Sequence, residues 1–527
     1  MKEIAYKISL LIDLIKWKIS TILLCKEVKK GKKNIIISEI NTSIASVKFN
    51  CILSKCLEMN GYNVYILFQK KTISYELYYR SLKIKNFIYL SNYDGIKISS
   101  LKKIKSIKSF SKLLNLKYQN INVGKWICSR ILNEKKIGNF KIEDLTQNEL
   151  TKYLNTSFNS VDSIINLEKN MKDFDIIFNE RGYSPSGEIF EYCLKTKKKV
   201  IQWFGSPLDG FNCFKKYTYQ NKDTHPLTLS DETFRYLLNH KSSKIFQKAV
   251  IKYLDNQYKS GRWFNRQDLQ SNKEILNKSE IVRLLKLDPQ KKIAVIFSHV
   301  FNDATFFYGK SLFKDYEDWL KQTLLEAIKN KKINWILKIH PANLWRSKIE
   351  NSSSVSLEEK LLNKIFDEIP SNLAVIKPDS KINTYSFFNS IDYGLTVRGT
   401  IGCELASFGI PVLTAGTGRY SNKGFTIDSS SINEFKNKVR KIHLINKLSK
   451  NKIRRARIYT YGSLIGRAIP MDGLRMRYNL EKSIFRPYHM DVPVEFLGLS
   501  DYVKKKDIRL LIKWIQSNQN YDFIELK

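Results

Sequence analysis

Short β-branched runs alternate with longer stretches of helical periodicity along most of the chain. The first half predicts four strands and two helices, in the order 34–38, 44–60 (helix), 63–68, 174–179, 187–197 (helix) and 199–204. Strands that alternate with helices favour a parallel sheet that helices cover on both faces.

The same alternation restarts at residue 291, after a polar stretch (205–290) that proline and glycine interrupt. The second series predicts strands at 291–298, 334–340, 373–377, 392–397 and 411–415, and helices at 316–330, 357–367 and 400–408. We therefore expect an α/β protein with two Rossmann-like domains that face each other across a cleft. Their expected bounds are 31–285, which includes the polar stretch as an insertion, and 286–445.

The N-terminal residues are apolar but not uniformly so. Asp13, Lys16 and Lys18 interrupt the apolar stretch 8–25, whereas a membrane-spanning helix needs about 20 mostly apolar residues. We expect an amphipathic, basic helix within 1–30, which either packs on the first domain or lies in a membrane interface. No transmembrane segment or signal peptide is expected.

The C-terminal residues 446–527 are basic and match no pattern of the two domains. We expect them to form an extension that crosses back and ends in an amphipathic helix at 503–516.

Composition narrows the class of protein. The 527 residues are 43% hydrophobic and 12% aromatic, which excludes a disordered chain. The formal net charge of +40 should attract phosphate-rich partners such as nucleotides, nucleic acid or anionic lipids, although an AT-rich genome explains a lysine excess equally well. The seven scattered cysteines lack zinc-ligand spacing and are expected to be free thiols in a reducing cytosol.

Polar residues follow two predicted strands of the second domain. His340-Pro341 ends one strand and Ser298-His299 ends another. Ligands of open α/β sheets bind at the carboxyl ends of the strands, and a neutral imidazole can donate a hydrogen bond to a phosphate oxygen. Histidines that only cap a turn or lie in a solvated loop fit the spacing equally well.

Glycines punctuate the turn that follows the strand at 392–397. Arg398-Gly399 forms a tight turn, and Thr400 begins a helix whose N-terminal amides suit an anion. Gly402 would let the backbone approach a ligand closely.

Glu404 and a second glycine-rich loop complete this pattern. Glu404 lies one turn into the helix, where its carboxylate could accept hydrogen bonds from ribose hydroxyls. Gly416, Thr417 and Gly418 end the next strand and are expected to face the same cleft. A plain βαβ turn with an exposed glutamate is the alternative.

The first domain offers a carboxylate at a strand end. Asn179, Glu180 and Arg181 follow one predicted strand, and Ser184 precedes the next helix. Glu180 suits a general base that deprotonates an acceptor hydroxyl. A Glu180–Arg181 surface pair or a helix cap is the structural alternative.

Two motifs carry a resemblance to a known family. LKIHPANLW (337–345) and SFFNSIDYGLTVRGTIGCELASFGIPVLTAGTGRYSNKGF (386–425) resemble the donor-binding half of bacterial capsule or surface-polysaccharide biosynthesis proteins. These are glycosyltransferases of the GT-B type, in the group that includes capsular Kdo transferases and bacterial polysialyltransferases. Residues 178–205 resemble the acceptor half of the same group more weakly.

The resemblance implies roles for several residues. His340 of the His-Pro motif would contact the donor phosphate, Thr400 would lie at the anion-binding helix end, and Glu404 would hold the ribose. Arg398-Gly399 stands where relatives often carry serine. Since no Asp-x-Asp motif ends a strand, we expect a metal-independent reaction without a cofactor, in which a CMP- or UDP-linked sugar is the co-substrate.

These observations lead to one hypothesis and two alternatives. The first is a cytoplasmic glycosyltransferase that moves a sugar from a nucleotide-sugar to a capsule, O-antigen or other surface glycan, either free or lipid-linked, with Glu180 or His299 as the base. It could associate peripherally with the anionic inner face of the plasma membrane. The alternatives are a nucleotide-activated polyol-phosphate transferase of the teichoic-acid type and a basic nucleic-acid-binding protein, for which no recognition motif is found.

Overall fold

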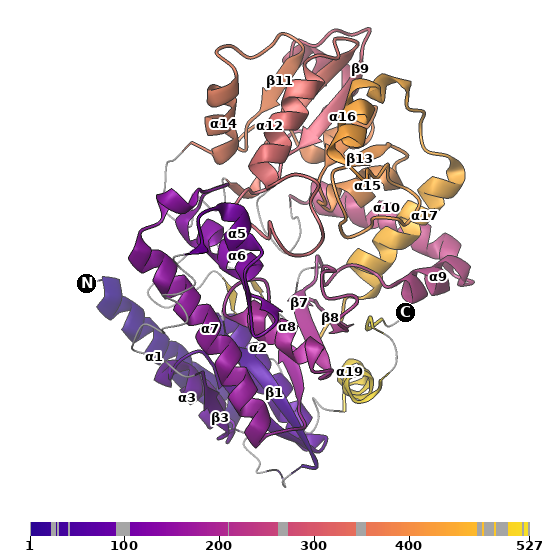
Figure 1. The fold of residues 1–527 in the computed structure, drawn as a ribbon. Helices are drawn as coiled ribbons and strands as arrows, with labels where there is room; N and C mark the ends of the chain where they lie inside the picture. Colours follow the sequence, from indigo (N-terminus) through magenta and orange to yellow (C-terminus); the bar gives the residue numbers. More distant parts are fainter. Residues whose placement is uncertain are drawn as a thin grey trace. The chain divides into compact units, whose positions relative to one another are not determined.

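The computed structural model describes most of the chain, namely residues 2–22, 28, 31–40, 43–90, 106–208, 210–261, 272–343, 355–471, 477–478, 490–491, 504–518 and 521–524. The chain forms two compact units (Figure 1). The first unit comprises 1–130, 141–222 and 467–527, and the second comprises 131–140 and 223–466.

The first unit contains a sheet of six strands in the order β3-β2-β1-β6-β7-β8. All neighbouring pairs are parallel except β7 and β8, which are antiparallel. The strands are β1 (Lys33–Glu39), β2 (Tyr62–Phe68), β3 (Phe87–Tyr89), β6 (Asp175–Phe178), β7 (Val200–Gly205) and β8 (Asn212–Tyr217). Two short antiparallel pairs lie outside this sheet: β4 (Lys117–Tyr118) with β5 (Ile121–Asn122), and β14 (Arg477–Tyr478) with β15 (Met490–Asp491).

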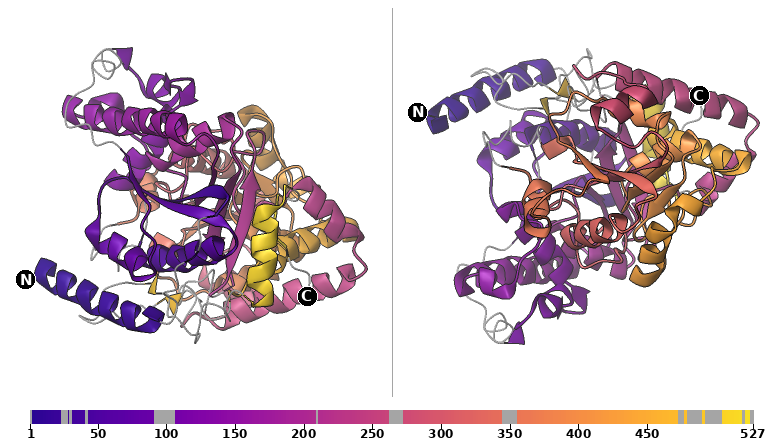
Figure 2. Two further views of the ribbon diagram at one scale, coloured as in Figure 1. Left: turned by 90° about the horizontal axis from the view of Figure 1, so that it is seen from below. Right: turned by 90° about the horizontal axis from the view of Figure 1, so that it is seen from above.

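Helices cover both faces of this sheet. They are α1 (Lys2–Thr21), α2 (Ile44–Met59), α3 (Ile73–Ser81), α5 (Phe110–Leu114), η2 (Ile142–Asp144), α7 (Gln147–Asn170), α8 (Ser186–Lys195) and α19 (Lys506–Gln516), while α6 (Gly124–Lys135) contributes to both units. Helices lie on both sides of the sheet in Figure 2. Because side chains alternate along a strand, Ile35 and Ile37 pack with α2, α3 and α19, whereas Ile36 packs with α7 and α8. Each face of the sheet therefore has its own apolar core.

The second unit contains a fully parallel sheet of five strands in the order β11-β10-β9-β12-β13. The strands are β9 (Lys292–Phe297), β10 (Ile333–Lys338), β11 (Leu373–Ile376), β12 (Tyr393–Thr396) and β13 (Val412–Thr414). In chain order this is 3-2-1-4-5, the doubly wound arrangement in which the strand order reverses beside the first strand. The reversal therefore lies between β9 and β12.

The helices of the second unit also lie on both sides of its sheet. They are α9 (Asp231–Asn239), α10 (Ser243–Lys259), α11 (Lys278–Leu284), α12 (Tyr316–Ala327), α14 (Leu357–Ile365), η3 (Thr384–Phe388), α15 (Ile401–Ser407), α16 (Ile432–Arg440), η4 (Ile442–Leu444), α17 (Lys450–Thr460) and η5 (Tyr461–Gly466). The core between the sheet and α12, α14 and α16 contains Trp319 and Trp335, both nearly inaccessible. The expectation of an α/β protein with two Rossmann-like units is confirmed.

The boundaries of the units differ from those expected. Residues 223–285 belong to the second unit, whereas we assigned them to the first. The polar stretch 205–290 also contains one strand and three helices, β8, α9, α10 and α11, rather than an insertion and a linker. Within the expected extension 446–527, residues up to 466 belong to the second unit and the rest to the first, and residue 503 of the expected final helix lies outside the described residues.

The N-terminal helix α1 packs on the first unit. Its Trp17 is buried and donates a hydrogen bond to Ser81 Oγ of α3 (3.0 Å). Among the helices that the structure describes, none is long and apolar enough to cross a membrane.

Candidate functional site

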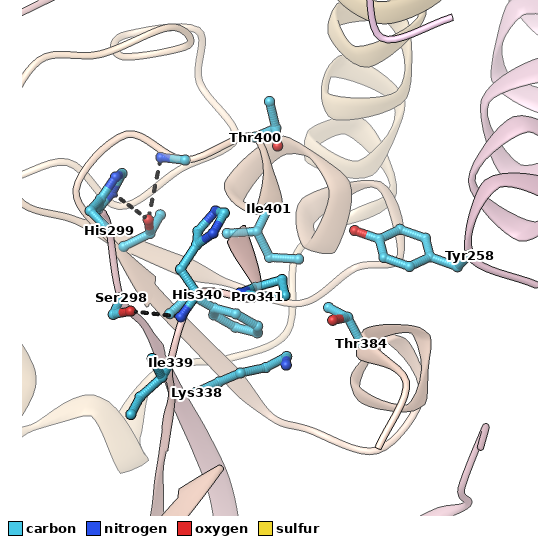
Figure 3. A pocket seen from close by; sticks show the side chains of 13 residues that line it. Tyr258, Ser298, His299, Lys338, Ile339, His340, Pro341, Thr384, Thr400 and Ile401 are labelled. Carbon is cyan, nitrogen blue, oxygen red and sulfur yellow. Dashed lines mark hydrogen bonds between the residues drawn. The ribbon is translucent and has the colours of Figure 1, made fainter. Parts of the chain in front are cut away.

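A pocket of the second unit lies at the carboxyl ends of three neighbouring strands (Figure 3). The ends of β9, β10 and β12 supply its floor, and α10, η3 and the start of α15 supply its walls. The pocket has a volume of about 530 Å³ counted out to its opening. Its lining residues are Tyr258, Phe297, Ser298, His299, Lys338, Ile339, His340, Pro341, Thr384, Thr396, Gly399, Thr400 and Ile401. Since the strand order reverses between β9 and β12, the pocket occupies the place where open α/β sheets bind ligands.

His340 lies in this pocket, immediately after β10. Its Nδ1 accepts a hydrogen bond from the backbone N–H of Ala342 (3.1 Å), two residues on across Pro341. The neutral ring therefore carries its proton on Nε2. The side chain points toward Ile401 and the turn that carries Thr400 (Figure 3), so that His340 presents a hydrogen-bond donor to the pocket.

Ser298 fixes the position of His340. Its Oγ accepts a hydrogen bond from the backbone N–H of His340 (3.0 Å) and donates one to Glu358 Oε1 (2.9 Å). Both oxygens of Glu358 accept from Asn343 Nδ2 at 2.9 Å. Burial raises the pKa of the Glu358 carboxyl to about 7, although these hydrogen bonds oppose the rise. Ser298 thus supports the turn from its buried side.

His299 is held differently, and its contacts argue against the role of a base. Its Nε2 accepts from the backbone N–H groups of Val397 and Arg398 (both 3.3 Å) and lies 3.1 Å from Thr396 Oγ1. Its ring stacks on Tyr316, with the centroids 4.6 Å apart. Burial, helped by the positive charge of Arg398, lowers the pKa of His299 well below its ordinary value. His299 is therefore a neutral ring whose Nε2 joins β9 to the turn after β12.

Lys338 is the most unusual group in the pocket. It is the last residue of β10 and only 3% exposed, and among the described residues its Nζ has no hydrogen-bond partner. Burial lowers the pKa of the ammonium to about 7, and the charge of Lys273 adds to the effect. The side chain extends along the pocket toward Thr384 (Figure 3). A buried, unpartnered amine in a pocket wall is suited to an oxygen atom of a ligand, because that contact would offset its desolvation.

Glu404 is close to the pocket but does not line it. It is 2% exposed, and its Oε2 accepts a hydrogen bond from the phenol of Tyr258 (2.5 Å), which does line the pocket. Burial raises the pKa of the Glu404 carboxyl, while the Tyr258 and Thr400 hydroxyls lower it. In this structure Glu404 positions Tyr258, and the ribose contact expected of it stays a prediction.

Arg398 is directed away from the pocket. Its Nη1 donates to the carbonyl of Phe307 (3.1 Å), its Nη2 donates to Ser311 Oγ, and its guanidinium lies over the ring of Tyr316. The side chain is 5% exposed and does not line the pocket. Arg398 thus holds the 307–311 loop, unlike its neighbours Gly399 and Thr400, which line the pocket.

The glycines beyond Gly399 serve packing. A Cβ on Gly402 would lie 2.0 Å from the hydroxyl of Tyr420, which donates to the Gly399 carbonyl (2.6 Å). A Cβ on Gly416 would lie 2.3 Å from the Lys310 carbonyl. The neighbouring loop residues Thr417 and Gly418 pack likewise, Thr417 N–H against the Lys310 carbonyl (2.8 Å) and Gly418 against Arg398. These residues, expected at the ligand, do not line the pocket.

The helix after β12 begins at Ile401 and is only seven residues long. Thr400 is its N-cap residue and lines the pocket with Gly399. The N–H groups of Cys403 and Glu404 already donate to the Thr400 carbonyl. The dipole of so short a helix adds little to the site, so the side chains must supply most of its polarity.

The residues expected on the acceptor side belong to the first unit. Arg181 is fully buried, donates to Gln202 Oε1 (2.9 Å) and stacks on two rings, so it braces the sheet. Ser184 is also buried. Glu180 is half-buried; its Oε1 accepts from the Gly182 N–H (2.6 Å), and its own N–H donates to Asn179 Oδ1 (2.6 Å). A catalytic role for Glu180 stays a prediction.

Sequence reasoning missed Lys338, Tyr258, Thr384 and Thr396. Lys338 had a signal, because it lies two residues before His340 and so projects from the same face of β10. Tyr258 had none, because its helix lies in the stretch interpreted as a linker. Among the described residues, no group of three or more His, Cys, Asp or Glu side chains is arranged to hold a metal ion.

Comparisons with known proteins add the following findings. No protein-family model matches the chain, and no curated protein matches it. The solved structures to which this chain is similar include KpsC from Thermosulfurimonas dismutans, a beta Kdo 2,4 transferase, at 10% identity over 58% of this chain and 87% of that one, with a TM-score of 0.33. A glycosyltransferase from Rickettsia africae ESF-5 is 12% identical over 93% of this chain and 100% of that one, with a TM-score of 0.29.

A third structure is UDP-GlcNAc 2-epimerase from Neisseria meningitidis bound to UDP-GlcNAc. It is 12% identical over 82% of this chain and 97% of that one, with a TM-score of 0.26. The solved structures that resemble this chain therefore include both glycosyltransferases and a sugar-nucleotide epimerase. The function proposed below rests on the residues of the pocket and on the two sequence motifs.

Proposed function

We propose that the protein is a glycosyltransferase and that the pocket of the second unit binds the nucleotide of a CMP- or UDP-linked sugar. The observation that carries the proposal is that Lys338, the last residue of β10, and His340, two residues further on, both line the pocket at the strand-order reversal. The first motif, which resembles the donor half of capsule and surface-polysaccharide glycosyltransferases, contains both residues.

The two side chains suit different oxygen atoms of a nucleotide. His340 presents an Nε2–H donor at the turn after β10, where a phosphate oxygen could accept a hydrogen bond from it. Lys338 lies deeper, and its buried ammonium would be stabilised by an anionic or carbonyl oxygen. Ser298 and His299 also line the pocket, but their hydrogen bonds hold the turns after β10 and β12, and neither is assigned a ligand contact in this scheme.

The remaining wall suits a flat, mostly apolar group. Tyr258, Phe297 and Ile401 line it, with the hydroxyls of Thr384 and Thr400 as polar points. Pockets of this kind, apolar with a few placed donors, are typical of small-molecule and cofactor sites. A pyrimidine base with its ribose has this character.

The chemical step would need a base from elsewhere in the chain. Glu180 of the first unit remains our candidate, and the acceptor would be a capsule, O-antigen or other surface glycan. His299 is not proposed as the base, because its Nε2 already accepts two backbone hydrogen bonds. The donors of the pocket would stabilise the charge that develops on the departing nucleotide, and loss of one such donor typically costs about 10²–10³-fold in rate.

A nucleotide screen followed by an activity assay tests the proposal. Thermal unfolding with CMP, UDP and their sugar conjugates should show stabilisation, because a ligand at 100 times its dissociation constant adds about 2.7 kcal/mol. His340→Ala should abolish the shift. His240→Ala is the matched control, since His240 Nδ1 accepts the same local hydrogen bond, from Ser242 N–H (3.1 Å), outside the pocket.

The assay then follows donor and products by mass spectrometry with a surface oligosaccharide as acceptor. Nucleotide release that depends on acceptor, with a glycosidic product, supports the proposal. A phosphodiester product would indicate a polyol-phosphate transferase instead, and acceptor-independent isomerisation of the sugar nucleotide would indicate an epimerase. An unchanged nucleotide shift in His340→Ala would refute the site.

A further inference from the structure

Helix α1 exposes an unbroken apolar stripe. The exposed fractions of its side chains are 64% for Ile4, 48% for Ile8, 58% for Leu11, 51% for Ile15 and 67% for Ile19, and Ile22 just beyond the helix is 63% exposed. Spacings of four and three residues place all six on one face of a helix. The stripe runs about 22 Å along the axis from Ile4 to Ile19 at 1.5 Å per residue.

The opposite face of α1 is anchored to the first unit. Trp17 packs beside Tyr78 of α3, with the ring centroids 5.9 Å apart, and Leu10 and Leu14 pack against the same core. Asp13 accepts hydrogen bonds from the Tyr78 hydroxyl (2.5 Å) and from Lys48 Nζ (2.8 Å). Since these contacts fix the rotation of the helix, the stripe is held outward as part of the fold.

The charges around the stripe are positive. Lys7, Lys16 and Lys18 are exposed beside it, whereas the carboxylate of Asp13 is turned inward and paired with Lys48. The whole chain carries a formal charge of +40. An apolar face bordered by lysines matches the boundary between acyl chains and anionic headgroups.

We propose that α1 is a membrane-surface anchor that binds an anionic lipid bilayer through this stripe, lying in the interface rather than spanning it. A second copy of the chain fits the apolar stripe of α1 less well than a bilayer does. In a coiled-coil repeat with Ile4 and Leu11 at one core position and Ile8 and Ile15 at the other, residue 18 would take the next core position, and it is Lys18. Two such helices would also bring like charges together.

Vesicle sedimentation of the full chain tests the proposal. We expect binding to phosphatidylcholine vesicles that contain phosphatidylglycerol, and weaker binding to pure phosphatidylcholine. The triple variant Ile8→Gln/Leu11→Gln/Ile15→Gln should bind about tenfold or more weakly. Ile245→Gln/Leu284→Gln/Leu444→Gln, which removes three side chains that are 66%, 59% and 67% exposed elsewhere, is the matched control and should bind normally.

A second pair of variants tests the contribution of charge. Lys7→Gln/Lys16→Gln/Lys18→Gln should weaken binding to anionic vesicles more than Lys152→Gln/Lys248→Gln/Lys321→Gln, which removes the same charge from exposed positions elsewhere. Equal weakening would mean that the overall charge, and not this helix, directs the protein to lipid.

The remaining outcomes decide against the proposal. It fails if the unmodified protein does not bind anionic vesicles, or if the stripe variant binds as well as its control. It also fails if ultracentrifugation shows a dimer that the stripe variant converts to monomers without any lipid binding. Should the stripe variant misfold, oxidative footprinting of the unmodified protein replaces it, and Ile8, Leu11 and Ile15 must then lose labelling when vesicles are present.

Discussion

Ser298 accepts a hydrogen bond from the backbone N–H of His340 at 3.0 Å, and this contact joins the end of β9 to the first turn after β10. The same hydroxyl donates to the buried carboxyl of Glu358. The orientation of the imidazole in the pocket thus depends on a buried serine that also lines the pocket. The histidine and its support come from strands that are neighbours in the sheet and 42 residues apart in the chain.

Ser298→Ala should therefore lower both stability and nucleotide affinity. The substitution leaves a buried N–H and a buried carboxyl each without one partner, and we expect a loss of about 1–3 kcal/mol in the free energy of unfolding. Urea denaturation measures this change, with Ser260→Ala, at an exposed helix end, as the control. A change of less than about 0.5 kcal/mol would mean that the turn holds itself without Ser298.

Lys338→Met should stabilise the unliganded protein at neutral pH and remove the contribution of this lysine to the pH dependence of the free energy of unfolding. Burial lowers the pKa of Lys338 to about 7 in the folded state, whereas the unfolded lysine titrates near about 10.4. Between these values the unfolded chain binds more protons, so the stability of the unmodified protein rises with pH across this window. In Lys338→Met that contribution to the rise should disappear, as denaturation at a series of pH values would show.

The same lysine predicts proton uptake when a nucleotide binds. An anionic oxygen beside Nζ favours the charged ammonium, so binding slightly above pH 7 should draw a proton from the buffer. Calorimetry in two buffers of different ionisation enthalpy would detect the uptake in the unmodified protein and not in Lys338→Met. Equal uptake in both proteins would assign the proton to another group.

Tyr258→Phe should destabilise the second unit through Glu404. The phenol donates to Glu404 Oε2, and removing it leaves a buried carboxylate with one donor fewer, at a cost of about 1.5–3 kcal/mol. Because the lost bond favours the ionised carboxyl, the deficit should grow as pH rises through the raised pKa of Glu404. Denaturation at acidic and neutral pH measures the effect, with Tyr236→Phe, a 51% exposed ring, as the control.

A deficit that is the same at both pH values would contradict this explanation. It would show that Glu404 stays protonated in the folded protein across that range, so that the phenol donates its hydrogen bond to a neutral carboxyl.

The sequence predicts the second sheet well because its strands are short β-branched runs that are buried on both faces. The same logic places His340 and Ser298 at the carboxyl ends of β10 and β9, where the structure has them. Strand β8 was missed because its sequence, NCFKKY, contains two lysines. Both are buried in the structure, Lys215 against Asp522 (2.8 Å) and Lys216 against the Trp514 carbonyl.

The errors at the site arise from contacts between segments that are distant in the sequence. Arg398 lies in the turn after β12 beside Gly399 and Thr400, which line the pocket, but its own partners, Phe307 and Ser311, come from a loop about 90 residues earlier. Tyr258 reaches the pocket from α10, in a stretch whose polar composition suggested a linker. Local pattern reveals which strand end a residue follows, whereas contacts between distant segments decide what its side chain touches.

The first unit is completed by residues that follow the second unit in the chain. Ile508, Leu511, Ile512 and Ile515 belong to the same core as β1 and β2, and Asp522 lies 2.8 Å from Lys215 of the edge strand. During translation the ribosome has synthesised all of residues 223–466 before these pieces emerge. The six strands of the first sheet are therefore synthesised well before α19 completes the apolar core on one face of that sheet, and a premature stop after residue 466 would leave that core incomplete.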